Sequence, residues 1–363
     1  MQNGIRRALR GLAVGVAILI VGAGSATAWD GAGHRMITRV ALRGLDESMP
    51  AWLKDDASVL AIADQSQTPD RWRGVSAQRV PQLKHLNDPD HYLDVEDLEA
   101  MGMSLRTMPI LRHEYVRAVA AARAKPEFAG EPVDPKKDMA KTNEYPGFLP
   151  ISTLEAYGKV VSAFKMVRQF EGLNQSGREP QIEAAKWNAR IHIGLLSHFV
   201  GDTAQPLHTT KHHHGWVGEN PNGYTTDYGF HRYIDGEILR IHRIADTDIA
   251  PKSDFARAIA ADDLWEQTAQ HIERSFKEVE PLYKLKKSGD LEQAVGKAFI
   301  VERLADASSQ LSAMIEAAWA EAAPTPKELQ DLKGFEGDRP PTPTGDAAAA
   351  VGGAQPAAPT GAK

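Results

Sequence analysis

The chain has 363 residues, no cysteine, 13 histidines and a formal charge of −6 at neutral pH. The absence of cysteine excludes disulfides and every metal site built on thiolates. With 42% hydrophobic and 25% charged residues, the composition is that of a folded globular protein rather than a disordered chain. Any bound metal must therefore be held by histidine, carboxylate, backbone or terminal groups.

Residues 1–28 have the pattern of a secretory signal peptide. Three arginines precede an apolar stretch at 11–24, which is followed by the cleavage pattern Ala26-Thr27-Ala28. An uncleaved membrane anchor is the alternative, but the apolar stretch is short for a bilayer. Cleavage would make the protein secreted or periplasmic, with Trp29 as its first residue. It would also remove three arginines and no acid, which changes the net charge from −6 to −9.

Helical patterns dominate the rest of the chain. Apolar residues recur at steps of three and four in 151–171 and in 181–203, where Trp187, Leu195 and Phe199 lie on the predicted apolar face. Four further segments are predicted to be helical: 33–45, 111–124, 254–279 and 290–321. Alternating strand patterns are scarce, so the sequence predicts an all-α fold.

Long segments without a helical pattern lie between these helices. We expect loops at 72–90, 125–150 and 207–229, and loops of this length indicate function or ordering on a ligand. Residues 326–363 are expected to form a disordered tail, because proline, glycine, alanine and threonine dominate from Gly337 onward. The folded domain is then 29–325.

The densest set of potential metal ligands lies in one window of the chain. His198 and Asp202 are four residues apart, as are His231 and Asp235, so each pair projects from one helix face. His208 lies on the loop between the pairs. One such pair is common on protein surfaces, but two pairs and His208 within 38 residues predict a zinc site.

The new N-terminus would add ligands to this set. Trp29 would carry a free α-amino group, which can bind a metal once it is deprotonated. His34 lies five residues further on, beyond a segment with two glycines that lets amine, carbonyl and imidazole converge.

Resemblance to a known family is carried by four segments: WDGAGHRMITRVAL, HYLDV, SHFVGDTAQPLH and FHRYID. They resemble the zinc-dependent single-strand nucleases of fungi and plants, the S-one/P-one nuclease family, which shares its fold with bacterial zinc phospholipase C. The resemblance covers most of 29–325. Its most specific features are the tryptophan directly after a signal peptide and the run Gly-Asp-x-x-Gln-Pro-Leu-His. The family's ligand spacings also recur, with ten residues from His198 to His208 and 23 from His208 to His231.

This resemblance implies a phospholipase C/nuclease-like helical domain with long loops around a trinuclear zinc cleft. One zinc would bind Asp70, His91, His198 and Asp202. A second zinc would bind His208, His231 and Asp235. A third zinc would bind the amine and carbonyl of Trp29, together with His34 and Asp202. Asp202 would therefore bridge two ions.

Two of these ligands have alternatives. Asp70 follows Gln67-Thr68-Pro69, where the family has Trp-Ala-Asp, so Asp64 is the other candidate. His91 heads the HYLDV motif, whereas His85 competes only by its spacing from Asp70. The family's transition-state arginine lies three residues after the liganding aspartate, which selects Arg73. Asp70 and Arg73 are therefore the expected catalytic residues.

The loop at 207–229 departs from the family, because a Gly-Gly-Asn stretch is missing there. Its sequence, KHHHGWVGENPNGYTTDYG, is typical of a turn-rich loop. Trp216, Tyr224 and Tyr228 either stack on a base or lipid headgroup or pack the loop onto the body. We expect 212–214, three consecutive histidines, to be a solvated stretch rather than an additional metal site.

The resemblance implies a zinc-dependent phosphodiesterase that cleaves single-stranded DNA or RNA to 5′-phosphate products and removes 3′-phosphates from nucleotides. Zinc would activate the attacking water. We expect a monomer with no stable membrane insertion after cleavage of the leader. The charge of −9 is a counter-argument, because nucleic-acid-binding proteins are usually basic.

Two other functions compete with this one. A zinc phospholipase C would keep the fold and the metals, although Asp235 favours the nuclease because phospholipases of this type usually have glutamate there. A non-enzymatic, zinc-stabilised secreted binding protein is the second alternative.

Overall fold

The computed structural model describes residues 29–73, 79–126, 128 and 141–336. These residues form helices and no strand, apart from an isolated bridge between Leu93 and Gly147. The all-α prediction is therefore confirmed. The predicted signal peptide at 1–28 and the segment from Gly337 onward lie outside the described residues.

The first half of the chain contains mostly short helices. They are α1 (Gly31–Arg43), α2 (Ala51–Lys54), α3 (Asp56–Gln65), α4 (Thr68–Arg73), α5 (Pro81–Asn87), η1 (Asp88–His91), α6 (Val95–Ala100) and α7 (Arg112–Arg123). The part of the chain from Leu149 onward contains the longest helices together with many short ones. In order, its elements are α8 (Leu149–Gly172), α9 (Glu179–Ala204), η2 (Pro206–His208), α10 (Phe230–Arg232), η3 (Tyr233–Glu237), α11 (Ile238–His242), α12 (Asp246–Ile249), η4 (Ala250–Lys252), η5 (Ala261–Asp263), α13 (Leu264–Lys277), α14 (Val279–Ser288), α15 (Ala294–Glu321) and α16 (Pro326–Glu336).

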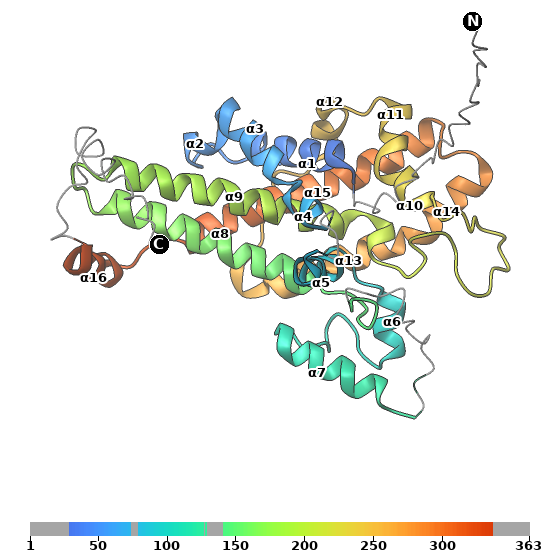
Figure 1. Cartoon of the computed structure of the whole chain (residues 1–363). Coiled ribbons are helices and arrows are strands. Elements are labelled where there is room, and N and C mark those ends of the chain that lie inside the picture. The colour runs from blue at the N-terminus through green and yellow to red at the C-terminus, as the bar shows by residue number, and fades with distance from the viewer. Residues whose placement is uncertain (1–28, 74–78, 127, 129–140, 337–363) are drawn as a thin grey trace, which may run out of the picture.

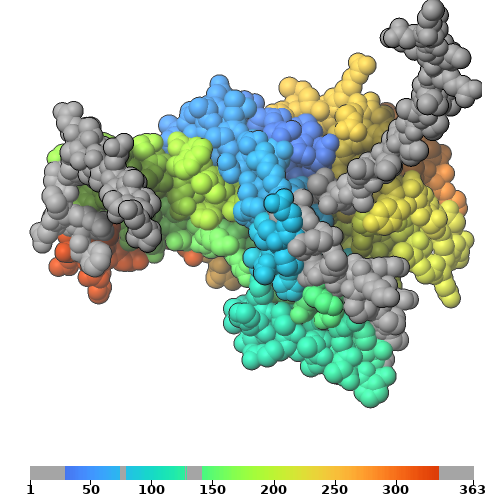
Figure 2. Space-filling view, in the orientation of Figure 1, coloured from blue at the N-terminus to red at the C-terminus, as the bar shows by residue number. Residues whose placement is uncertain are grey.

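The core lies where α8, α9 and α15 run lengthwise beside one another, with α1 and α3 packed on α9 (Figure 1). Fully buried apolar residues such as Phe164, Leu196 and Leu311 fill the space between these helices. The segment that contains α6 and α7 protrudes from this body (Figure 2). The helices at 33–45, 111–124, 151–171, 181–203 and 290–321 are thus confirmed within a few residues.

Local signals explain where the helices that carry the site begin and end. Asp30 caps α1 by accepting hydrogen bonds from the N–H groups of Ala32 and Gly33, at 2.9 and 3.4 Å. Pro180 lies in the first turn of α9, where its missing N–H costs nothing. Pro206 follows the last turn, because proline cannot continue a helix.

The predicted helix at 254–279 is wrong in its first third, because α13 begins only at Leu264. Side chains of the preceding segment bind other elements instead of forming a helix. Phe255 packs over Gly44, where a Cβ atom would lie 2.1 Å from the ring. Arg257 donates a hydrogen bond to Asp306 at 2.8 Å.

The predicted apolar face of α9 is also partly wrong. Trp187 is 49% exposed, whereas the buried face contains Ala189, Ile193, Leu196 and Val200. The error arises because this helix buries small and polar residues toward its C-terminal end. A pattern of large apolar residues does not detect them.

Two segments expected to lack structure contain helices. The loop predicted at 72–90 contains α5, which Pro81 begins and an ion pair between Lys84 and Asp88 at 2.7 Å stabilises. The disordered tail predicted at 326–363 is wrong for 326–336, which forms α16. Its Thr325-Pro326-Lys327-Glu328 start is a capping box, in which Glu328 accepts from the N–H of Thr325 at 2.7 Å.

Candidate metal centre

His198 and Asp202 project from the last turns of α9, and both are fully buried. Nδ1 of His198 is 2.7 Å from the carbonyl oxygen of Ser66, so this nitrogen donates a hydrogen bond to the main chain. The lone pair is then on Nε2, which lies 3.4 Å from Oδ2 of Asp202. The backbone carbonyl thereby fixes the ring orientation that a metal ligand requires.

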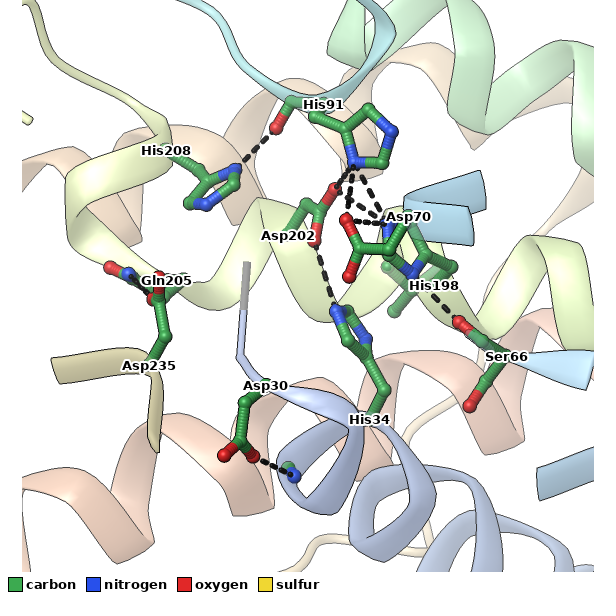
Figure 3. Close-up of polar contacts among 12 residues, drawn as sticks. Asp30, His34, Ser66, Asp70, His91, His198, Asp202, Gln205, His208 and Asp235 are labelled. Carbon is green, nitrogen blue, oxygen red and sulfur yellow. Dashed lines mark hydrogen bonds and ion pairs between the residues drawn. The ribbon is translucent and has the colours of Figure 1, made fainter. Parts of the chain in front are cut away.

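His91 reaches the same point from η1, and Asp70 reaches it from α4. Nδ1 of His91 lies 2.8 Å from Nε2 of His198 and 3.1 Å from Oδ2 of Asp202. Oδ1 of Asp70 is 3.8 Å from the same nitrogen of His91. Two imidazoles and two carboxylates therefore converge (Figure 3). They are the four side chains that the resemblance implies for one zinc.

His34 joins this group from α1. Its ring stacks on His198 with centroids 4.0 Å apart, and its Nε2 lies 3.4 Å from Oδ1 of Asp202. Gly201 makes room for it, because a Cβ atom there would lie 2.8 Å from Nδ1 of His34. Asp202 thus presents one oxygen to His34 and the other to His91, which is the arrangement that a bridging carboxylate needs.

His208, His231 and Asp235 form a neighbouring cluster. Nδ1 of His208 donates to the carbonyl oxygen of His91 at 2.5 Å, which leaves its Nε2 for the cluster. Nε2 of His231 lies 3.5 Å from Oδ2 of Asp235, across the π-helical turn η3. Such turns are rare and are frequently found at functional sites.

Gln205 is a site residue that the sequence reasoning missed. Its amide nitrogen donates to Oδ1 of Asp235 at 2.7 Å, and its amide oxygen accepts from the N–H of Leu207 at 2.6 Å. These bonds orient the Asp235 carboxylate and leave Oδ2 for a metal (Figure 3). The signal was present, since Gln205 lies in the Gly-Asp-x-x-Gln-Pro-Leu-His run.

The start of α1 is attached to the second cluster. The N–H of Asp30 donates to the carbonyl oxygen of Asp235 at 2.8 Å, and Trp29 is completely buried. Gly236 leaves room for this contact, because a Cβ atom there would lie 2.3 Å from Oδ2 of Asp30. Ala28 lies outside the described residues, so the role of the Trp29 amine and carbonyl as ligands stays a prediction.

The structure separates the alternative ligands. Asp64 has a side chain that is 56% exposed and pairs with Arg71 at 3.1 Å. His85 is exposed on α5. Neither belongs to a His/Asp cluster in the described part of the chain, whereas Asp70 and His91 do.

Arg73 places a positive charge beside the clusters. Its Nη1 lies 3.6 Å from Oδ1 of Asp70, and its Nε lies 3.5 Å from Oδ1 of Asp88. Burial lowers the pKa of His91 well below its usual value, and the charge of Arg73 lowers it further. The guanidinium thus faces the site, where the sequence predicts the catalytic arginine.

Burial dominates the electrostatics of the site. It raises the pKa of Asp202 and of Asp235 well above the usual range. It raises the pKa of Asp70 to about 7, against the opposing charge of Arg73. It lowers the pKa of His198 and therefore favours the neutral imidazole that binds metals. A divalent cation would favour the ionised carboxylates in turn.

Buried oxygen and nitrogen atoms that have no hydrogen-bond partner show whether the site fits a metal ion, because a metal would occupy them. Among the described residues they include Oδ1 of Asp70 and Asp202, Oδ2 of Asp235, and Nε2 of His208 and His231. Buried polar atoms are rarely left without a partner, because their desolvation is costly. Neutral imidazoles and carboxylates are a donor set for zinc. Three groups of side chains can therefore hold metal ions: His34, His198 and Asp202; Asp70, His91 and His198; His208, His231 and Asp235.

The consecutive histidines at 212–214 belong to none of these three groups within the described residues. His212 stacks on Trp216 at 3.9 Å, and its Nδ1 accepts from the N–H of Val217. His213 faces Asp94 at 3.7 Å. Tyr224 and Trp216 pack the loop onto Tyr283 of α14, whereas Tyr228 is 75% exposed. The expectation of a solvated stretch at 212–214 is wrong for His212, which is buried against Trp216.

Comparison with known proteins adds no assignment. No family model, no curated protein and no solved structure matches the chain. Among the described residues, no helix is both long enough and apolar enough to cross a membrane.

Proposed function

We propose that the protein is a zinc-dependent phosphodiesterase of the phospholipase C/nuclease fold that cleaves single-stranded DNA and RNA to 5′-phosphate products. The observation that carries this proposal is the shared use of Asp202. Its Oδ1 faces His34 and its Oδ2 faces His91. His198 and Asp70 reach the same site. Three zinc ions at such a site would supply a water-derived nucleophile at neutral pH and charge compensation for the phosphate.

Arg73 binds the phosphoryl group in this proposal. The Arg73 side chain is 14% exposed, and its guanidinium is already oriented by Asp70 and Asp88. Planar N–H donors match two phosphoryl oxygens and gain strength as negative charge develops during in-line attack. Asp70, beside Arg73, orients the attacking water. Gln205 holds the Asp235 carboxylate, and the Ser66 carbonyl holds the His198 ring.

The net charge sets how the substrate is bound. A mature chain with a charge of −9, derived from −6 by removal of three arginines, has no overall attraction for nucleic acid. Binding then depends on local contacts of the phosphate with the metal centre and Arg73. We therefore expect short single-stranded substrates and 3′-nucleotides to be hydrolysed as well.

The proposal is tested by measuring which phosphate esters the zinc-loaded protein hydrolyses. The protein is produced with its own leader, so that secretion can remove the leader before Trp29. Denatured DNA, duplex DNA and phosphatidylcholine vesicles are incubated separately, and the ends of DNA products are analysed. We expect cleavage of denatured DNA, with 5′-phosphate ends. Turnover of phosphatidylcholine without DNA cleavage would instead identify a phospholipase C. Zinc binding without hydrolysis of either substrate would favour the non-enzymatic binding protein.

Paired variants make this test specific. Asp70→Asn removes a carboxylate from the site, whereas Asp64→Asn removes one that is exposed and lies outside the three His/Asp groups. His91→Ala and His85→Ala form a second pair. The proposal expects large losses of activity from the first member of each pair and none from the second.

A further inference from the structure

A cavity of about 460 Å³ lies where η4 and the segment after it meet α13 and α15. Nine of its ten lining residues are charged and the tenth is Ser309, so the cavity suits a charged ligand rather than an apolar one. None of the ten belongs to the three His/Asp groups found in the described part of the chain. Five of the lining residues are cations: Lys252, Arg257, Arg274, Lys277 and Arg303.

Asp306 lines this cavity and is shared by two guanidinium groups. Its Oδ1 accepts a hydrogen bond from Nη2 of Arg257 at 2.8 Å, and its Oδ2 lies 3.6 Å from Nε of Arg274. Nε2 of the buried His271 lies 3.2 Å from Oδ2 as well. Burial alone would raise the pKa of Asp306, but these three neighbours lower it well below its usual value. One carboxylate therefore compensates at most one of the two arginine charges.

The other three cations of the cavity have no such compensation. Lys252, Lys277 and Arg303 form no ion pair and no side-chain hydrogen bond with another described residue. Nε of Arg303 is buried, and it has no hydrogen-bond partner among the described residues. A buried charged donor without a partner is costly, because it has lost its hydration. A bound anion would accept a hydrogen bond from this atom.

The carboxylates of the cavity do not cancel its positive charge. Asp254 and Glu302 are exposed, as are the two lysines, so water screens all four of these charges. The partly buried charges that remain are three guanidiniums and the carboxylates of Glu278 and Asp306. This leaves a surplus of one positive charge, in a chain whose formal charge is −6. The cavity thus differs in sign from the molecule as a whole.

We propose that this cavity is a second phosphate-binding site, which takes a phosphate group that is either free or part of a nucleic-acid strand. Guanidinium groups present paired N–H donors that match phosphoryl oxygens, and lysines add mobile positive charges. Arg303 would donate its Nε–H, and Lys252 and Lys277 would close over the ligand from the surface. The inference goes beyond the proposed function and does not depend on it, because no residue of the metal centre takes part.

The test measures binding of two phosphate compounds to the zinc-loaded protein by calorimetry. One is inorganic phosphate, and the other is a thymidine tetranucleotide with phosphorothioate linkages, which resist hydrolysis. Arg303→Gln and Lys277→Gln change the cavity. Arg117→Gln and Lys125→Gln are the matched controls, because both residues are exposed in or just after α7 and neither lines the cavity.

We expect a phosphate site that depends on the cavity, in addition to any binding at the metal centre. Arg303→Gln should weaken this site about 10- to 150-fold, which corresponds to one hydrogen bond from a charged donor. Lys277→Gln should weaken the same site about two- to fivefold, because its charge is exposed. The two controls should bind phosphate as the wild type does, and zinc content should be the same in all variants.

The tetranucleotide distinguishes the two sources of the phosphate group. Tetranucleotide binding that Arg303→Gln weakens would identify a site for the strand. Loss of inorganic phosphate binding alone would identify a site for free phosphate, and both results support the inference. Binding of both compounds that neither Arg303→Gln nor Lys277→Gln changes would overturn it. Equal losses from the cavity variants and their controls would overturn it too, since they would reflect only the overall charge.

Discussion

Two histidine-rich regions lie close together in this protein, and they use their imidazoles differently. In the metal centre, His198 and His208 each donate one ring nitrogen to a main-chain carbonyl oxygen and direct the other at a carboxylate cluster. In the loop, Nδ1 of His212 instead accepts a main-chain N–H. Nδ1 of His213 lies 3.1 Å from the carbonyl oxygen of Thr210, but His213 belongs to none of the three His/Asp groups in the described residues. The number of histidines therefore does not locate a metal site. A metal site is located instead by the group that the second nitrogen of each ring faces.

Burial of the histidines differs between the two regions, except at His212, which is buried in the loop. His198 and Asp202 are completely buried, and Nε2 of His198 lies 3.4 Å from Oδ2 of Asp202. His213 and His214 are partly exposed, and His214 is stacked on an open tyrosine. In the metal centre, a cation would bind buried polar atoms that have no hydrogen-bond partner. The loop has fewer such atoms, so it would be stabilised less by a cation.

The largest expected effect is the loss of the bridging carboxylate. Asp202→Asn removes a negative charge and an anionic donor from two of the three predicted zinc sites. We expect zinc content to fall to about one ion per chain and hydrolysis to fall at least about a hundredfold. Plasma mass spectrometry and the DNA assay measure both. Asp64→Asn is the matched control, and equal losses from both variants would show that the geometry around Asp202 is irrelevant.

The Arg73→Ala variant distinguishes residues that bind the metal from a residue that stabilises negative charge on the phosphate in the transition state. Arg73→Ala should lower kcat about 10²- to 10³-fold, the effect of removing one preorganised donor from a transition state. Zinc content should stay the same, because Arg73 is not a ligand. Arg71→Ala, which breaks only an exposed pair with Asp64, serves as the control. A loss of zinc with the loss of activity would show that Arg73 acts by supporting the site.

Gln205 tests the importance of groups that orient ligands. Gln205→Ala leaves Asp235 without its 2.7 Å hydrogen bond. We expect zinc affinity or activity to fall about 10- to 100-fold, as is typical for partners of metal ligands. Competition with a chelating dye measures the affinity. Unchanged affinity and activity would mean that Asp235 does not bind the metal through the oxygen that Gln205 leaves available.

The smallest effect is expected in the loop. His213→Asn should leave zinc content unchanged, in contrast to His198→Asn, which should lower it. His212→Ala should instead reduce the free energy of unfolding by about 1 kcal/mol, because Val217 loses a hydrogen-bond acceptor. Urea denaturation measures that change. Loss of zinc from His213→Asn would contradict the contrast between the two regions.

Sequence alone predicted much of this architecture and part of the site. The i, i+4 spacing placed His198 near Asp202 and His231 near Asp235, because helix geometry is local. The convergence of Asp70 and His91 on them was not local, and it came only from the resemblance. The HYLDV motif favoured His91 over His85, and the fold agrees because it buries His91 and exposes His85.

The errors have physical causes as well. Phe255 packs on Gly44 from a segment with helical composition, a tertiary contact that overrides local preference. Gln205 was overlooked because it donates a hydrogen bond to Asp235, a predicted zinc ligand, and is not itself a predicted ligand. The helix α16 was missed although the Thr-x-x-Glu capping box that begins it is visible in the sequence. Composition of the whole tail concealed that local signal.

The most direct test of a trinuclear centre is the number of zinc ions per chain, measured on two forms of the protein. One form begins at Trp29 after removal of the leader, and the other carries an additional methionine before Trp29. We expect three zinc ions in the first form and two in the second, with most activity lost, because the extra residue removes the free amine. Fewer than two ions in both forms, or three ions and full activity in both, would contradict this expectation.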